Sequence, residues 1–182
     1  IGTLARQAVG RGKDVVIGYL RQEAGLDSNR TLLEELWTAF PEARATEIRL
    51  HEIAAELEGG SGDMDALIEE QAGLFEEFER LDGYRIESRI GRVVQGLGFA
   101  QTGARSGEAS DIDKRCGEFS GGWQMRIALA KVLVRRPENI LLDEPTNHLD
   151  KSARDWLAAD LLEYKGSCLI ITHDAEFLDM VA

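Results

Sequence analysis

Residues 139–150 constrain the fold of this 182-residue chain more than any other segment. The apolar run of Ile140, Leu141 and Leu142 ends in two adjacent acids, Asp143 and Glu144, before a proline. A short, continuous apolar run is typical of a strand that a parallel sheet buries on both faces. Open α/β sheets bind their ligands beyond the carboxyl ends of such strands. The two carboxylates are therefore predicted at a ligand-binding edge, where one could hold Mg²⁺ and the other could orient water for phosphoryl transfer.

Helical and strand patterns alternate through the last third of the chain, which indicates an α/β fold. Residues 1–22 have the composition of strands and turns, and Gln22 follows a strand around Tyr19. On composition alone, Gln22 is an ordinary polar residue. The predicted order of the other elements is helix 83–99, a polar loop to about 118, helix 121–135, strand 139–143, helix 152–164, strand 167–172 and a helix from 174.

The periodicity of residues 31–82 predicts a helical hairpin inserted into this α/β domain. Thr31 and Glu34 have the spacing of a capping box, and Pro41 is expected to break or restart the first helix. In the return helix, which starts at Asp63, apolar residues recur at steps of three and four, and the other faces are rich in glutamate. Two helices joined by a short glycine-rich turn should pack antiparallel.

The formal net charge of −12 is concentrated in the predicted hairpin. Residues 31–82 hold 15 acidic and three basic side chains, and the remainder of the chain is balanced. A generic nucleic-acid-binding protein would present a basic surface, which this composition does not provide. The alternatives for the hairpin are a contact with a basic protein, a contact made by its tip, or a solvated charged surface.

Composition also favours an intracellular protein. The sequence contains neither an apolar run of membrane-spanning length nor a secretory signal pattern. Cys116 and Cys168 lack the spacing of a metal or redox motif and suit a reducing compartment as small buried side chains. We therefore expect a cytoplasmic location, with an organelle stroma or matrix as the alternative.

Two further segments contain residue types that suit phosphate chemistry. Ser120, Gly121 and Gly122 precede a helix, whose exposed backbone N–H groups attract anions, although an ordinary cap has the same composition. Their position about 20 residues before the acid pair favours the functional interpretation. His173 follows the last predicted strand and could reach a phosphate or a catalytic water; a surface or capping histidine is the alternative. Asp174 is expected to cap the next helix.

Together these motifs resemble the ATP-binding-cassette ATPases. A D-loop with Asn147-His148, and a helical arm at 31–82, resemble the first nucleotide-binding domain of the ABC-F proteins. Those proteins are soluble twin-cassette ATPases, many of which act on the ribosome. The resemblance covers nearly the whole chain and is strongest over 117–150. The matching segments are the Q-loop at 18–23, the signature at 119–123, the Walker B strand at 140–144, the D-loop at 147–150 and the H-switch at 172–174.

The resemblance implies a role for each residue of the hydrolytic centre. Asp143 would bind Mg²⁺, usually through water, and Glu144 would act as the general base toward the attacking water. His173 would contact the γ-phosphate of ATP. Gln22 would approach both the Mg²⁺ and the water.

The resemblance also implies a second cassette. Ser120, Gly121 and Gly122 would close over the γ-phosphate of ATP held by that cassette, and Asp150 would couple the two sites. ATP and Mg²⁺ are thus the implied ligands, and the ribosome is the implied target. The implied divisions are a partial ATPase core (1–30), the acidic arm (31–82), a helical subdomain with its loop (83–118) and the core from signature to H-switch (119–182).

One motif of the family does not occur in the sequence. The Walker A loop, which cradles phosphate, requires Gly, four residues, and then Gly-Lys-Ser/Thr. At Gly12-Lys13, the residue five positions before the glycine is Gln7, and Asp14 follows where a hydroxyl is needed. We therefore expect a fragment of a longer ATPase, inactive by itself. A nucleotide-binding subunit of a transporter and a non-catalytic interaction module are the alternatives.

Overall fold

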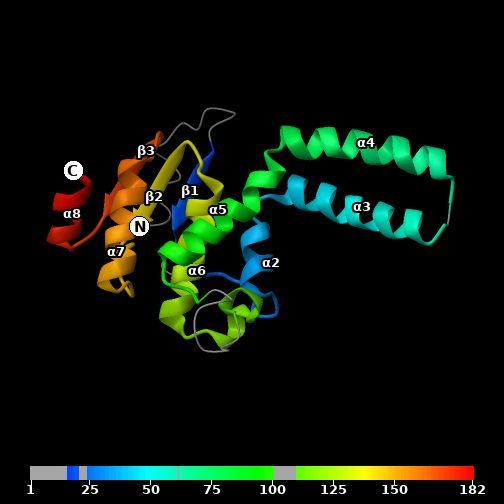
Figure 1. The fold of residues 1–182 in the computed structure, drawn as a ribbon. Coiled ribbons are helices and arrows are strands. Elements are labelled where there is room, and N and C mark those ends of the chain that lie inside the picture. Colours follow the sequence, from blue (N-terminus) through cyan, green and yellow to red (C-terminus); the bar gives the residue numbers. More distant parts are fainter. Residues whose placement is uncertain (1–15, 21–23, 61, 101–109) are drawn as a thin grey trace, which may run out of the picture.

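The computed structural model describes residues 16–20, 24–60, 62–100 and 110–182. They form a body of sheet and helices from which a two-helix arm projects (Figure 1). The arm consists of α3 (Pro41–Glu58) and α4 (Met64–Arg80). The body contains β1 (Ile17–Leu20), α2 (Leu32–Trp37), α5 (Gly83–Gly96), η1 (Asp111–Asp113), η2 (Cys116–Glu118), α6 (Gly121–Arg135), β2 (Asn139–Asp143), α7 (Lys151–Leu162), β3 (Ser167–Ile171) and α8 (Ala175–Val181).

The three strands form one parallel sheet with β2 in the middle, so the predicted α/β class is confirmed. Leu142 of β2 pairs with Leu20 of β1 on one side and with Ile170 of β3 on the other. Because the strands are parallel, their carboxyl ends meet at one edge of the sheet. The polar residues that follow β2 and β3 are thereby brought together.

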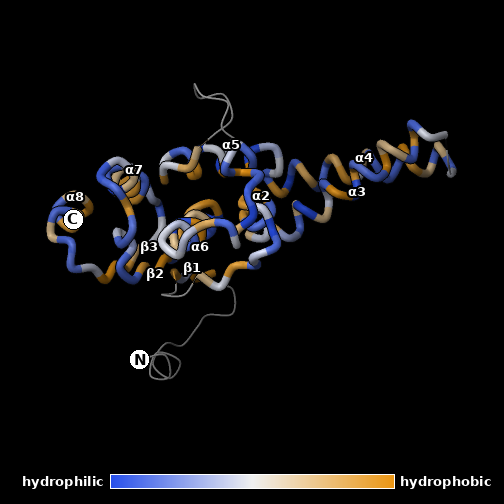
Figure 2. Tube along the Cα trace, turned by 90° about the horizontal axis from the view of Figure 1, so that it is seen from below, coloured by the Kyte–Doolittle hydropathy of each residue, from blue (hydrophilic) through white to orange (hydrophobic). Residues whose placement is uncertain are grey.

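Helices α6 and α7 cover one face of the sheet (Figure 2). Leu142 of β2 lies in the same buried core as Leu129 of α6 and Leu157 of α7. Successive side chains of a strand point to opposite faces, so the neighbouring positions lie on the other side of the sheet. That side carries the exposed apolar side chains Tyr19, Leu169 and Ile171.

Helix α2 belongs to the body and not to the projecting hairpin. The predicted capping box is present: Thr31 Oγ1 accepts from the Glu34 N–H, and the Glu34 carboxylate accepts from the Thr31 N–H. Leu36 is fully buried, and α2 packs against α6. Glu35 is buried as well, because its carboxylate accepts a hydrogen bond of 2.5 Å from Lys131 of α6. The antiparallel pair within the predicted segment 31–82 is therefore α3 and α4 alone.

The arm is held together by a thin apolar seam and by ion pairs. Pro41 is the first residue of α3, where its missing N–H costs nothing, as the predicted restart requires. Leu67 of α4 and Ile53 of α3 are buried in the seam. Arg49 of α3 donates two hydrogen bonds, of 2.7 and 2.9 Å, to Glu70 of α4. This bidentate pair joins the two helices on their exposed side.

Several predicted element ends differ from the structure. The helix predicted over 83–99 ends at Gly96, because Gly98 adopts a left-handed φ of 85°. The strand predicted to 172 ends at Ile171, because the Thr172 hydroxyl accepts the backbone N–H of Asp174 and starts a turn. The helix predicted over 152–164 spans Lys151–Leu162, and the helix expected from 174 spans Ala175–Val181, with Asp174 as its cap.

Candidate active site

The two acids lie at the carboxyl edge of the central strand, where the sequence placed them. Asp143 is the last residue of β2, and Glu144 follows it with a left-handed φ of 50°. The Glu144 N–H donates to the carbonyl of Ile171 at 2.7 Å, which ties this turn to the end of β3. A left-handed conformation at a non-glycine residue is uncommon and often marks a functional site.

The Glu144 carboxylate is fixed by the turn that follows β3. Its Oε2 atom accepts hydrogen bonds from the Thr172 hydroxyl at 3.3 Å and from the His173 N–H at 3.4 Å. Its Oε1 atom lies 3.5 Å from Nε2 of His173. The Glu144 side chain is 24% exposed, and that of His173 is 98% exposed. A positioned carboxylate next to an exposed imidazole suits proton transfer from a water at this edge.

Asp174 joins the turn after β3 to helix α8 and to Arg154 of α7. Its side chain caps α8 by accepting the N–H of Phe177 at 3.0 Å, as the sequence predicts. This bond, with a lesser contribution from Arg154, holds the pKa of Asp174 below its usual range. The cap of α8 therefore anchors the turn that positions Glu144.

The signature segment begins α6, and its two glycines have different surroundings. Ser120 occupies the N-cap position, but among the described residues its hydroxyl makes no capping hydrogen bond with the helix. A Cβ atom at Gly121 would meet nothing within 4 Å. A Cβ atom at Gly122 would lie 3.3 Å from the ring of His148 in the D-loop. The open start of α6 suits an anion. Gly122 has no side chain and so allows the D-loop to approach α6.

Arg126 joins the signature helix to the D-loop, a role that its sequence motif does not predict. Its Nε donates to the His148 carbonyl at 2.8 Å, and its Nη1 donates to the Leu97 carbonyl at 3.1 Å and to Asp150 at 3.4 Å. The guanidinium also lies 4.3 Å from the centre of the Trp123 ring. The available signal was its place between the apolar residues Met125 and Ile127 in a helix that faces the core, a pattern that Lys131 of the same helix shares.

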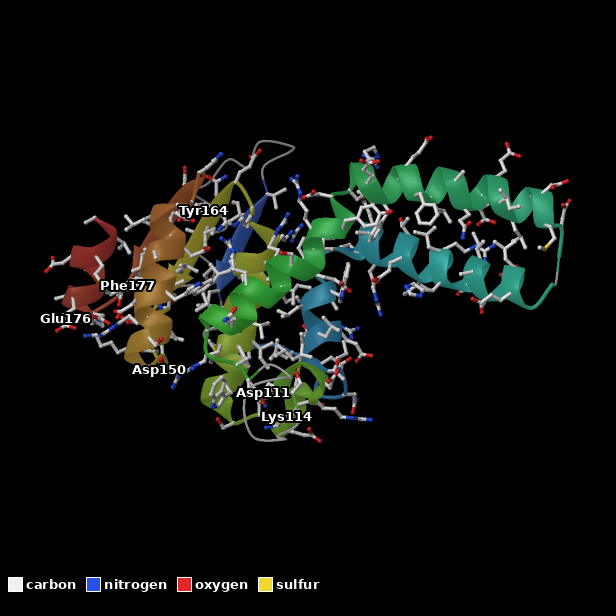
Figure 3. The ribbon with its side chains drawn as sticks, viewed as in Figure 1. Asp111, Lys114, Asp150, Tyr164, Glu176 and Phe177 are labelled. Atoms are coloured by element: carbon white, nitrogen blue, oxygen red, sulfur yellow. The ribbon has the colours of Figure 1, made fainter. Side chains whose placement is uncertain are left out.

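Asp150 caps the first turn of α7 (Figure 3). Its carboxylate accepts the N–H of Ala153 at 2.9 Å, and this bond, followed by the charge of Arg126, lowers the pKa of Asp150. The cap fixes where the D-loop ends and α7 begins. Asp150 is therefore held by the same arginine that holds His148.

The Walker B and D-loop segments both line a hollow of about 180 Å³. Asp143 and Glu144 line one part of it, and Asn147 and His148 line another. Carboxylate oxygens are the ligands that Mg²⁺ prefers, and Mg²⁺ bound with a nucleotide takes one or two of them plus phosphate and water. The described residues contain no cluster of three or more His, Cys, Asp and Glu that could hold a metal ion. The carboxylates of Asp143 and Glu144 in this hollow are of the type that binds Mg²⁺ together with phosphate and water. Gln22 and Gly12-Lys13 lie outside the described residues.

Comparison with known proteins identifies the family. The sequence profile of the ABC transporter family matches residues 9–147. The chain belongs to this family. The recognition of an ATP-binding cassette from its signature and Walker B segments is thereby confirmed. Members of this family are ATPases, so this cassette is expected to bind ATP.

The curated relatives of this cassette support the ABC-F resemblance. The energy-dependent translational throttle protein EttA of Haemophilus influenzae is 36% identical over 168 residues. ABC transporter F family member 5 of Arabidopsis thaliana is 34% identical over 172 residues. The alignments cover 92% and 91% of this chain but 28% and 23% of those proteins. The cassette thus spans about a quarter of the length of these relatives.

Solved structures support the fold. One described as the ATP-binding subunit of an ABC transporter matches this cassette with a TM-score of 0.56 and 16% identity, over 91% of this chain and 52% of that one. At this identity the likeness establishes the fold alone.

Within the described ranges, the cassette has no helix whose length and apolar content would let it cross a membrane.

Proposed function

We propose that this cassette supplies the catalytic acid, the switch histidine and the signature turn of an ABC-F type ATPase that acts on ribosomes in the cytoplasm. One observation carries the catalytic part: the turn after β3 holds the Glu144 carboxylate at the strand edge through Thr172 and the N–H of His173. A general base must be positioned before its basicity matters, and this carboxylate is positioned by two independent donors.

In the proposed reaction, Glu144 takes a proton from a water molecule. The water oxygen forms a bond to the γ-phosphorus of ATP as the bond from that phosphorus to the ADP oxygen breaks, which yields ADP and inorganic phosphate. Asp143 would hold Mg²⁺, whose charge neutralises the phosphate oxygens. The exposed imidazole of His173 would contact the γ-phosphate, and Gln22 would approach the Mg²⁺ and the water.

A second cassette completes the proposal. Ser120, Gly121 and Gly122 would close over the γ-phosphate of ATP held by the other cassette, and Asp150 would couple the two sites. The Walker A pattern does not occur in these 182 residues, and without it the β- and γ-phosphates lack their cradle. We therefore expect hydrolysis in the complete protein that the gene encodes, and weak or no nucleotide binding by these residues alone.

The ribosomal role rests on the relatives and on the arm. Relatives with 36% identity are named for translational control, and here a helical arm interrupts the cassette between β1 and the signature helix. A transporter subunit is the second candidate, since the family carries that name. A transporter cassette needs a surface there that couples to its permease. The acidic surface of the arm does not match this need, which makes a transporter subunit the weaker candidate.

Co-sedimentation with ribosomes tests the role. The complete protein carrying Glu144→Gln should be trapped on ribosomes with ATP and released with ADP, because it binds ATP and cannot hydrolyse it. Glu163→Gln, an exposed change in the same domain, should behave like the unmodified protein. Ribosome binding that ignores both the nucleotide and Glu144→Gln would support a non-catalytic interaction module. A complete lack of ribosome binding would remove the translational role.

A further inference from the structure

An open groove of about 350 Å³ lies where the arm joins the body, away from the hydrolytic centre. Three helices and the end of α2 form it: α3 presents residues at helical spacing, α4 presents Phe75 and Phe78, and α5 presents Tyr84. Its lining residues include Trp37, Glu47, Leu50, Phe75, Tyr84 and Glu87.

The groove exposes aromatic surface that a folded chain usually buries. Phe75 is 46% exposed and Tyr84 is 63% exposed. Tyr84 is held in place by an edge-to-face contact with Phe78, whose ring centre lies 5.0 Å away. Gly83 permits this packing, because a Cβ atom there would lie 2.5 Å from the Phe78 ring. The aromatic surface is therefore preorganised, which reduces the entropy lost on binding a partner.

The surroundings of the groove are strongly acidic. Residues 41–80 hold 12 acidic side chains and three arginines. Each arginine already pairs with a carboxylate of the arm, namely Arg44 with Glu47, Arg49 with Glu70 and Arg80 with Glu77. The arm therefore keeps a net excess of nine negative charges, and Glu47 and Glu87 belong to the groove wall itself.

These two properties together select the chemistry of an occupant. An RNA, an anionic lipid surface and a second copy of this chain all carry negative charge, and the arm would repel them. A cationic protein segment would be attracted, and its lysine or arginine heads could also stack on the exposed rings. An apolar or aromatic side chain of that segment would fill the groove between Leu50 and Phe75.

We propose that this groove is a docking site for a basic protein segment with an apolar or aromatic anchor. The segment lies against α3, α4 and α5 at the base of the arm, with its cations toward Glu47 and Glu87. Docking needs neither ATP nor the Glu144 site, so it goes beyond the proposed ATPase activity and can fail independently of it.

Fluorescence anisotropy with the full 182-residue chain tests the docking site. The probe is a short labelled helical peptide with leucine and tryptophan on one face and lysine on the other. A companion peptide has serine in place of the leucine and tryptophan, and a labelled single-stranded RNA provides an anionic ligand. Phe75→Ser removes the anchor contact, and Ile68→Ser is its control, a residue of the same helix that is 54% exposed and outside the groove. Glu87→Lys and Glu58→Lys form a second pair that tests charge without removing packing.

The expected result is binding of the apolar-faced peptide with a Kd at least about tenfold lower than that of the serine peptide. Phe75→Ser and Glu87→Lys should each raise this Kd by about tenfold, while Ile68→Ser and Glu58→Lys change it by less than about threefold. Far-ultraviolet circular dichroism confirms that the variants stay folded. Equal affinity for the two peptides, equal effects of Phe75→Ser and Ile68→Ser, or tighter binding of the RNA at the groove would each overturn the proposal.

Discussion

Arg126 of the signature helix donates a hydrogen bond of 2.8 Å to the backbone carbonyl of His148 in the D-loop. The same side chain bonds to the Leu97 carbonyl and is only 9% exposed. Replacing Arg126 by Met should lower the free energy of unfolding by about 2–3 kcal/mol, because buried acceptors lose a charged donor. Urea unfolding measures this. Arg85→Met is the control, since that side chain is 81% exposed, and it should cost less than about 0.5 kcal/mol. Equal costs for the two variants would show that Arg126 does not join the segments.

The two signature glycines should respond differently to alanine. Gly121→Ala introduces a Cβ atom into open space and should leave the free energy of unfolding unchanged or raised by a few tenths of a kcal/mol, since alanine favours helix. Gly122→Ala places a Cβ atom 3.3 Å from the His148 ring and should be about 1 kcal/mol less stable than Gly121→Ala. Thermal unfolding of both variants compares them directly. A Gly122→Ala variant as stable as Gly121→Ala would mean that the D-loop moves freely away from α6.

The Asp150 cap should make stability depend on acid pH. The N–H of Ala153, followed by Arg126, lowers the pKa of Asp150 in the folded state, so folding favours the ionised carboxylate. Its contribution is complete above the pKa of the unfolded state, about 3.9, and is lost as the pH falls through the lower folded pKa. Asp150→Asn keeps a side-chain oxygen for the cap but cannot titrate. The free energy of unfolding should therefore fall less steeply below about pH 4 in Asp150→Asn than in the unmodified chain. Asp155→Asn, an exposed change on the same helix, is the control. If the free energy of unfolding depended on pH equally in Asp155→Asn and in Asp150→Asn, the role of the cap would be contradicted.

Local patterns in the sequence were sufficient for much of the fold. The limits of β2 and α6, the capping box at Thr31 and the cap at Asp174 follow from short-range periodicity and side-chain chemistry, and the structure confirms them. These features depend on residues close together in the chain. Glu144 and His173 are 29 residues apart, and they meet because the parallel strands β2 and β3 end at one edge of the sheet.

Other features depend on contacts between distant residues, and the sequence did not reveal them. From the sequence, Glu35 would be an exposed acid of a helix. In the structure it is buried, where it accepts a hydrogen bond from Lys131, 96 residues away, and this bond joins α2 to the body. Arg126 gains its role only when Leu97 and the D-loop arrive beside α6. The groove at Phe75 and Tyr84 exists because α3, α4 and α5 converge, which no periodicity within one helix encodes.

Hydrolysis of ATP by the complete protein tests the central claim, the role of Glu144, most directly. Phosphate release is measured at saturating ATP for the unmodified protein, for Glu144→Gln and for the exposed control Glu163→Gln, with ATP binding measured in parallel. General base catalysis by a positioned carboxylate contributes about 100-fold or more, so Glu144→Gln should lose at least that factor in rate while it still binds ATP. The Glu163→Gln protein should hydrolyse ATP at the unmodified rate. Hydrolysis by Glu144→Gln at the unmodified rate would contradict the assignment of Glu144 as the catalytic base.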